Sequence, residues 1–195
     1  MALMASYAID AGDRIVWTDQ GFAGLAAEHG LAELAEDAVG RPLIEFVAGE
    51  RPRALQRALI ARARATPAKD PLELRYRCDS PAMRRFAVLQ MAGQPDGGVV
   101  FTTWFEATED RPYQPLLDRR AEHGPDTVEL CAWCNRVKTS DGWHEVEDLP
   151  PSAQTDGCAP AVADGLCEIC ELLLTTRALT RPGAGPTRSG PYGLP

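Results

Sequence analysis

Four cysteines in two Cys-x-x-Cys pairs are the residues with the clearest chemistry in this chain. The pairs are Cys131 with Cys134 and Cys167 with Cys170. Together they can supply four thiolates to one soft metal ion, and a closed four-thiolate cage is typical of structural zinc. An iron–sulfur cluster uses the same ligand set, and a disulfide or dithiol switch could use the same pairs. Because such a cage leaves no position for substrate, it favours architecture or sensing over hydrolysis.

The remaining candidate ligands are weaker. Cys78 falls in an alternating strand pattern and is interpreted as a small core residue, whereas Cys158 lies in a Gly/Pro-rich loop without an assigned role. His144 and Asp164 could replace a thiol, but four thiols already satisfy zinc. Residues 135–166 separate the pairs by more than a compact zinc ribbon does, so this stretch must fold or loop out.

Composition limits the possible partners. The 195-residue chain has a formal net charge of -8, which argues against nucleic acid as the main partner. No apolar run reaches the roughly 18 residues that a membrane span needs. The chain starts without a recognisable secretory signal, so we expect a cytoplasmic protein whose thiols stay reduced.

Residues 1–112 are predicted to form one α+β domain. Leu72, Leu74 and Tyr76 alternate with charged residues, as in a half-buried strand. A turn at Ala11–Asp13 is expected to use the conformational freedom of Gly12, and Thr18 or Asp19 is expected to cap the first helix. The predicted strands cover 7–10, 14–17, 72–78, 84–91 and 99–106. Residues 39–46 are predicted to form a turn and a short helical segment with Pro42 in its first turn, and residues 51–65 a long helix. Short turns between consecutive strands predict a five-stranded antiparallel sheet.

The rest of the chain divides into three predicted segments. Residues 113–127 are interpreted as a linker, 128–177 as a four-cysteine zinc-binding module, and 178–195 as a disordered tail rich in Pro and Gly. Leu116 and Leu117 either form a seam for self-association or pack on their own domain. The apolar pattern of the first segment is self-contained, so we expect that segment to fold without metal.

The order of elements resembles a PAS domain. The resemblance rests on Gly12–Phe22 and Val39–Phe46 and covers most of residues 5–108. It implies an antiparallel sheet around a pocket bounded by helices, which binds a ligand or cofactor or serves for dimerisation and signal relay. The possible pocket residues are Phe22, Phe46, Leu59, Tyr76, Phe86, Thr102 and Trp104, although residues with these periodicities also simply fill cores.

The second half resembles a Cys-rich module that follows sensory domains in bacterial signalling proteins. The matching residues are Cys131, Trp133, Cys134, Gly142, Trp143, Glu147, Gly165, Leu166, Cys167 and Cys170. Asp164 stands where that module has His and Glu168 where it has Pro. The metal ligands are therefore kept, and the histidine of the module is replaced by Asp164.

Neither flavin nor haem is expected. The Asn-Cys-Arg segment of light-sensing relatives is absent, and the helix at 51–65 has no histidine to ligate haem. GxSxG, P-loop and Rossmann motifs are also absent. His29, His123 and His144 are scattered without an evident Cys or Ser partner.

The sequence therefore predicts a non-catalytic bacterial signalling or regulatory protein with a structural zinc site. Its PAS-like half would sense a small ligand or bind a signalling partner, and we expect it to form a homodimer. The alternative is a redox or metal sensor in which the four-cysteine cluster, with zinc or an iron–sulfur cluster, is itself the input. The ligand, the signal and the partner stay unidentified.

Overall fold

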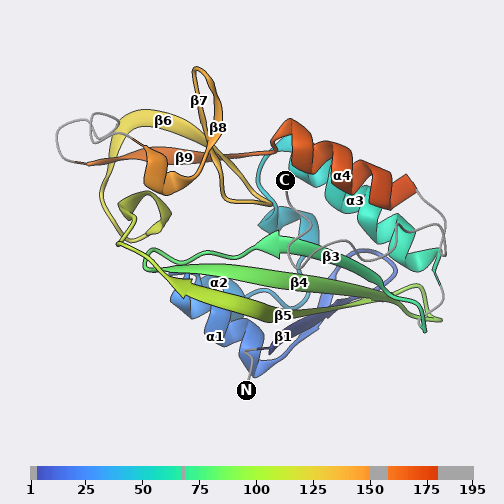
Figure 1. The fold of residues 1–195 in the computed structure, drawn as a ribbon. Coiled ribbons are helices and arrows are strands. Elements are labelled where there is room, and N and C mark those ends of the chain that lie inside the picture. Colours follow the sequence, from blue (N-terminus) through green and yellow to red (C-terminus); the bar gives the residue numbers. More distant parts are fainter. Residues whose placement is uncertain (1–3, 67–68, 150–157, 180–195) are drawn as a thin grey trace.

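A five-stranded antiparallel sheet forms the larger part of the molecule (Figure 1). The computed structural model describes residues 4–66, 69–149 and 158–179. The strand order is β2-β1-β5-β4-β3. The strands are β1 (Met4–Ile9), β2 (Ile15–Thr18), β3 (Leu72–Arg77), β4 (Met83–Gly93) and β5 (Val99–Asp110). The predicted mixed α+β class and five-stranded antiparallel sheet are thus confirmed.

Helices occupy the stretch between β2 and β3. They are α1 (Gln20–Glu28), α2 (Ala32–Glu36), the 3-10 helix η1 (Leu43–Phe46) and α3 (Glu50–Arg64). Asp19 caps α1, because its carboxylate accepts the Phe22 backbone N–H at 2.7 Å. In the first turn the predicted role of Gly12 is wrong, since Asp13 takes the left-handed conformation with φ 63°. Asp tolerates this conformation better than most residues with a Cβ atom.

A second sheet of four strands follows, in the order β8-β7-β6-β9. Its strands are β6 (His123–Cys131), β7 (Val137–Thr139), β8 (Gly142–His144) and β9 (Ala159–Gly165). The short 3-10 helices η2 (Pro115–Leu117) and η3 (Val146–Asp148) flank it, and α4 (Glu168–Leu179) ends the described chain. Strand β6 already starts within residues 113–127, where the sequence predicts a linker. Residues 180–195 of the predicted tail lie outside the described residues.

One buried apolar cluster runs through both parts of the molecule. It joins Ile9, Leu59 and Phe101 of the first part to Leu166 and Leu174 of the second, together with all four cage cysteines. Leu116 packs instead into a second cluster under the smaller sheet, with Leu117 against it. These two leucines therefore pack against the smaller sheet and not back on the larger one. Whether they also form a seam for self-association stays a prediction.

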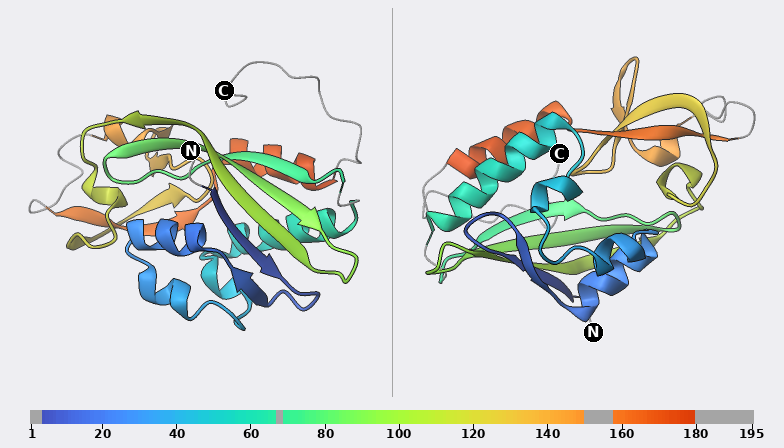
Figure 2. Two further views of the ribbon diagram at one scale, coloured as in Figure 1. Left: turned by 90° about the horizontal axis from the view of Figure 1, so that it is seen from below. Right: turned by 180° about the vertical axis from the view of Figure 1, so that it is seen from behind.

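Helix α4 lies alongside α3, so that α3 is covered by a segment more than a hundred residues later in the chain (Figures 1 and 2). The chain enters α3 at Gly49, which has φ 79°. A Cβ atom there would lie 2.7 Å from the Asp164 carbonyl oxygen of β9, so only glycine allows this approach. In the described part of the chain, no helix is long and apolar enough to cross a membrane.

Candidate metal centre and the adjoining cavity

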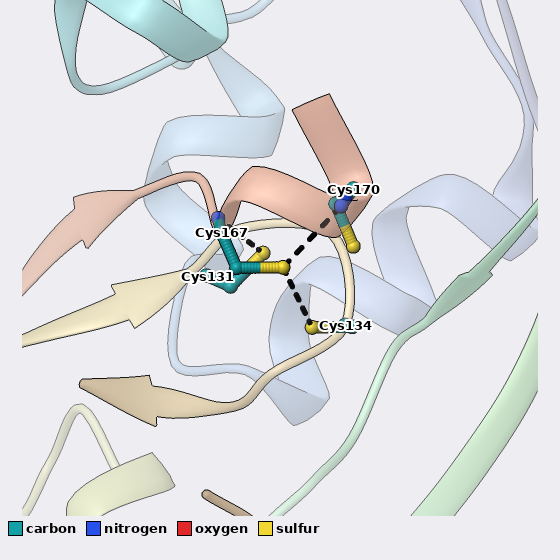
Figure 3. Close-up of side chains that lie close together, drawn as sticks. All are labelled: Cys131, Cys134, Cys167 and Cys170. Atoms are coloured by element: carbon teal, nitrogen blue, oxygen red, sulfur yellow. Dashed lines mark hydrogen bonds between the residues drawn. The ribbon is translucent and has the colours of Figure 1, made fainter. Parts of the chain in front are cut away.

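The four predicted ligands come together at one point between the two parts of the molecule (Figure 3). Cys131 ends β6, Cys134 follows in the next loop, and Cys167 and Cys170 stand at the start of α4. All four side chains are buried, and their Sγ atoms lie within 4.8 Å of one another. The cluster joins a strand end, a loop and a helix start that are distant in sequence.

The first pair forms a tight turn. The Asn135 N–H donates to the Cys131 carbonyl at 2.9 Å, and the Cys131 N–H donates to the Arg136 carbonyl at 2.8 Å. Asn135 closes the turn in the left-handed region with φ 57°, which Asn adopts more readily than most residues. In the second pair, backbone N–H groups point at sulfur: Cys167 donates to Cys131 Sγ and Cys170 to Cys167 Sγ, both at 3.4 Å. Such contacts favour thiolates.

The thiols cannot all ionise without a cation. Hydrogen bonds from Cys134 and Cys170 lower the pKa of Cys131. The same contact with Cys131 raises the pKa of Cys134, and contacts with Cys131 and Cys134 raise the pKa of Cys170 as well. Ionisation of one thiol thus makes ionisation of the neighbouring thiols less favourable, because like charges in a buried site repel each other. A bound cation would let all four ionise.

The spacing fits a tetrahedral metal site. The Sγ atoms of Cys134 and Cys167 are 3.8 Å apart, and a tetrahedron with Zn–S bonds of about 2.3 Å has edges of about 3.8 Å. The four close cysteines are therefore placed to bind a metal ion, and all positions of a tetrahedral site would be filled by protein.

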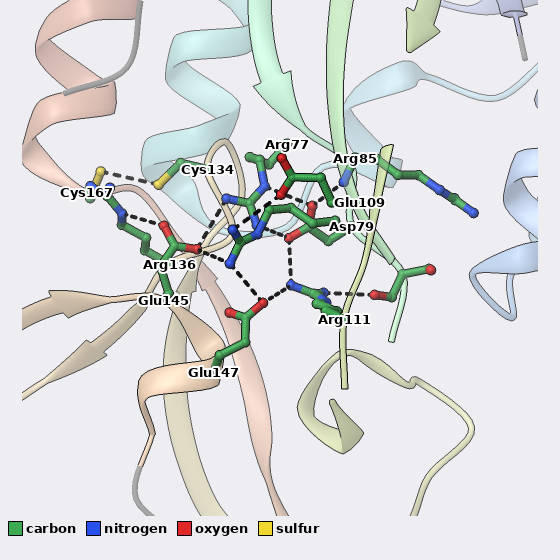
Figure 4. A network of polar contacts seen from close by, with 12 residues as sticks. Arg77, Asp79, Arg85, Glu109, Arg111, Cys134, Arg136, Glu145, Glu147 and Cys167 are labelled. Carbon is green, nitrogen blue, oxygen red and sulfur yellow. Dashed lines mark hydrogen bonds and ion pairs between the residues drawn. The ribbon is translucent and has the colours of Figure 1, made fainter. Parts of the chain in front are cut away.

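A network of buried and half-buried charges connects the cage to the larger sheet (Figure 4). Asp79, just after β3, is buried and pairs with Arg77 and Arg111. Arg77 continues to Glu145 at 3.2 Å, which also pairs with Arg136 at 3.1 Å beside the cage. Burial lowers the pKa of the Arg136 guanidinium, but the hydrogen bond and charge of Glu145 outweigh this effect, so the pKa is raised. The nearby Cys134 and Cys167 add smaller contributions in the same direction.

Strand β3, at the edge of the larger sheet, is also bonded directly to the cage loop. The Arg77 N–H donates to the Trp133 carbonyl at 2.9 Å, and the Trp133 indole N–H donates to the Arg75 carbonyl at 2.7 Å. Trp133 lies between the two cysteines of the first pair. The loop that holds half of the cage therefore covers the free edge of the sheet.

A cavity of about 650 Å³ adjoins the cage loop. Its walls come from α3, η1, the end of β3, η2 and the inner face of the smaller sheet, and Trp133 of the cage loop completes them. This volume is within the range of roughly 300–1,000 Å³ typical of ligand sites. The cavity thus lies between the two parts of the molecule rather than within the first part alone.

A chain of polar groups stands at one end of this cavity. The Tyr76 hydroxyl is 3.2 Å from Thr103 Oγ1, and Cys78 Sγ is 3.6 Å from His29 Nε2. The expectation that no histidine has a cysteine partner is therefore wrong. Burial raises the pKa of the Cys78 thiol to about 11 and lowers the pKa of His29. The pair is consequently neutral near pH 7, unlike the activated thiolate of a nucleophilic cysteine.

The structure separates the predicted pocket residues into two groups. Phe46, Leu59 and Tyr76 line the cavity. Phe22 packs against Tyr7, with ring centroids 5.4 Å apart, and the Phe86 ring lies under the Arg77 guanidinium. Thr102 and Trp104 alternate along β5 with the buried Phe101 and Thr103, so they lie on the opposite face of the sheet. Whether any of these residues binds a ligand stays a prediction.

Sequence reasoning missed the residues around the cage that carry charge. Asp79, Arg111 and Glu147 are far apart in the sequence, and nothing in their spacing indicates one network. The strand pattern did place Arg77 among residues of a half-buried strand, but it gave no reason for burying an arginine. The pairing of Cys78 with His29 had no sequence signal either.

Comparison with known proteins gives little further information. No family model matches the chain, and no curated protein matches it. Among solved structures, the chain is similar to the PAS domain of an HTR-like protein from Haloarcula marismortui, at 14% sequence identity. The match covers 55% of this chain and 81% of that one, with a TM-score of 0.31. A similarity this weak carries no argument about fold family or function.

Proposed function

We propose that this chain is a non-catalytic signalling or regulatory protein in which a structural zinc ion holds a sensory α+β domain and a smaller sheet together. The observation that carries this proposal is the buried four-thiol cage, whose cysteines belong to the same apolar cluster as the larger sheet. A closed site has no position for substrate. The neutral Cys78–His29 pair likewise lacks the lowered thiol pKa of a nucleophile. We infer a cytoplasmic, PAS-like sensor that acts by association, including self-association.

Elemental analysis of anaerobically purified protein, with an absorbance spectrum, tests the metal. We expect one zinc per chain and no visible chromophore. Cys134→Ser should lose the zinc, whereas the matched control Cys158→Ser should keep it, because Cys158 is not among the four clustered thiols. Full zinc occupancy in Cys134→Ser would refute the ligand assignment.

Light scattering on full-length protein tests the self-association, for which a homodimer is expected at high micromolar concentration. A strict monomer under these conditions would refute that part of the proposal.

One observation favours the alternative, a redox or metal sensor. A small cavity opens beside Cys134, Cys167 and Cys170, and Arg77 and Arg136 line it. Glu145 lines the cavity too and pairs with both arginines. The partly compensated positive charge that is left beside the thiols favours thiolates and hence oxidation. A brown chromophore, or reversible zinc release on mild oxidation with hydrogen peroxide, would support this alternative. Zinc that is retained under the same treatment would support the structural role.

A further inference from the structure

The cavity of about 650 Å³ has a volume and a lining that suit a small ligand. Most of its lining is apolar, and Phe46, Tyr76 and Trp133 provide aromatic walls. The Tyr76 and Trp133 rings lie 5.5 Å apart at an angle of 45°. The two rings are therefore already in tilted contact with each other. A flat aromatic molecule would pack on the ring surface that they and Phe46 leave to the cavity, because ring pairs prefer offset or tilted contacts.

The fixed charges of the lining cancel. Arg77 and Asp79 pair with each other, and Arg119 and Asp164 add one charge of each sign. The polar end consists of the Tyr76 hydroxyl, the Cys78 thiol and the His29 imidazole. Burial raises the pKa of Tyr76 and of Cys78 and lowers that of His29, so these groups offer hydrogen bonds without charge. A charged ligand would be desolvated here without a matching counter-charge.

The metal cage builds one wall of the cavity. Trp133 stands between Cys131 and Cys134, and its indole and carbonyl are both bonded to β3, which carries Tyr76. Leu166, directly before Cys167, lines the cavity as well. Both Cys-x-x-Cys pairs therefore adjoin residues of the cavity wall. We expect loss of the metal to loosen the loop that carries Trp133, although two hydrogen bonds to β3 also hold this residue.

We propose that this cavity binds a small, uncharged aromatic molecule carrying a hydrogen-bonding group, and that it does so only while the metal cage is intact. This inference rests on the proposed function, since it takes the cage to be loaded with metal. By thermodynamic linkage, a ligand that requires the cage must in turn stabilise the cage.

The first experiment uses N-phenyl-1-naphthylamine, an uncharged aromatic probe with one N–H group, whose fluorescence rises in apolar sites. We expect saturable binding to the zinc-loaded full chain with one site per chain. The anionic probe 1-anilinonaphthalene-8-sulfonate, which adds a sulfonate to the same frame, should bind at least about tenfold more weakly, because the cavity offers its charge no compensation. Equal binding of both probes would overturn the assignment to an uncharged ligand.

A matched pair of variants on β9 tests whether the probe binds inside the cavity. Both Val162 and the adjacent Ala163 are exposed, but only Val162 lines the cavity. Val162→Trp should weaken binding by at least about tenfold, because the larger side chain overfills the site, and Ala163→Trp should leave it within about twofold, as surface substitutions usually do. If both variants bind like the wild type, the probe binds elsewhere and the inference is wrong.

The dependence on metal is tested with the cage variants. Cys134→Ser should lose probe binding together with its zinc, and Cys158→Ser should keep both. In the wild type, saturating probe should slow the transfer of zinc to the chelator 4-(2-pyridylazo)resorcinol. Probe binding that survives zinc loss overturns the inference, as does a wild type that holds zinc but binds no probe; the second result leaves the proposed function standing. A wild type without zinc refutes the proposed function itself.

Discussion

At the scale of single residues, the first knuckle depends on the backbone of Asn135. Its φ of 57° lies in the left-handed region, which costs most residues with a Cβ atom about 1–2 kcal/mol. We expect Asn135→Gly to leave the free energy of unfolding unchanged. Asn135→Val should lower it by about 1–2 kcal/mol, because a β-branched side chain is strained in this backbone conformation. Urea unfolding of the zinc-loaded protein measures both. Equal stability of the Gly and Val variants would show that the turn relaxes.

Cys78 gives a pH-dependent prediction at the same scale. Burial raises the pKa of its thiol from 9.0 to about 11, so at pH 8 only about one thiol in a thousand is the reactive thiolate. Alkylation by iodoacetamide should therefore accelerate about tenfold per pH unit between pH 8 and pH 10. The stability that the neutral thiol contributes is fully present below pH 9.0 and is lost as the pH rises through about 11.

Mass spectrometry of the zinc-loaded Cys158→Ser protein isolates this reaction, because the other four cysteines are expected to be held by metal. Modification of Cys78 at pH 7.5 as fast as that of free cysteine would contradict a half-buried, neutral thiol with a raised pKa. It would also remove the argument that the polar end of the cavity is uncharged.

At the scale of elements, α4 has one buried and one exposed apolar face. Leu174 is 3% exposed and belongs to the shared core, whereas Leu172 is 69% exposed. Leu174→Ala should lower the free energy of unfolding by about 2–5 kcal/mol, through lost burial and the remaining cavity. The matched control Leu172→Ala should change it by less than about 0.5 kcal/mol. Thermal or urea unfolding of both zinc-loaded variants measures the difference, and similar losses would mean that α4 docks by another face.

The elements show what the sequence could predict. Helix α3 and strands β3, β4 and β5 were predicted within a few residues, because local periodicity reports which face of an element is buried. The sequence did not show which face of β5 points inward. Phe101 and Thr103 are the buried residues, whereas Thr102 and Trp104 were predicted to line the pocket. A shift of one residue exchanges the faces of a strand, and an aromatic-rich strand gives no clear alternation to fix it.

The candidate site also has a part that the sequence could predict and a part that it could not. The four cage cysteines were predictable because each pair is local and metal geometry joins the pairs. The cavity was not, because its walls come from both sheets, and Trp133 faces Tyr76 only through the packing of one part on the other. The charge network of Asp79 depends on the same packing.

At the scale of the whole molecule, the two parts are joined by more than the chain. The apolar cluster crosses between them, and Arg77, beside the cage loop, pairs with Asp79 on one side and Glu145 on the other. Removing one partner of such a buried pair is strongly destabilising, since it leaves an uncompensated charge. This continuity weighs against the expectation that residues 1–112 fold independently of the metal.

Removal of metal from the full chain decides between these views. With a shared core, chelation by EDTA should lower the melting temperature of the whole molecule in one cooperative transition, because loss of the cage uncovers α3 and the edge of β3. Hydrogen exchange should then show the amides of Glu50–Arg64 and Leu72–Arg77 losing protection together with those of Glu168–Leu179. The far edge strand β2 provides an internal control, since it lies at the other end of the larger sheet. If only residues 123–179 lose protection and the larger sheet melts unchanged, the two parts are independent modules and the cage stabilises only its own.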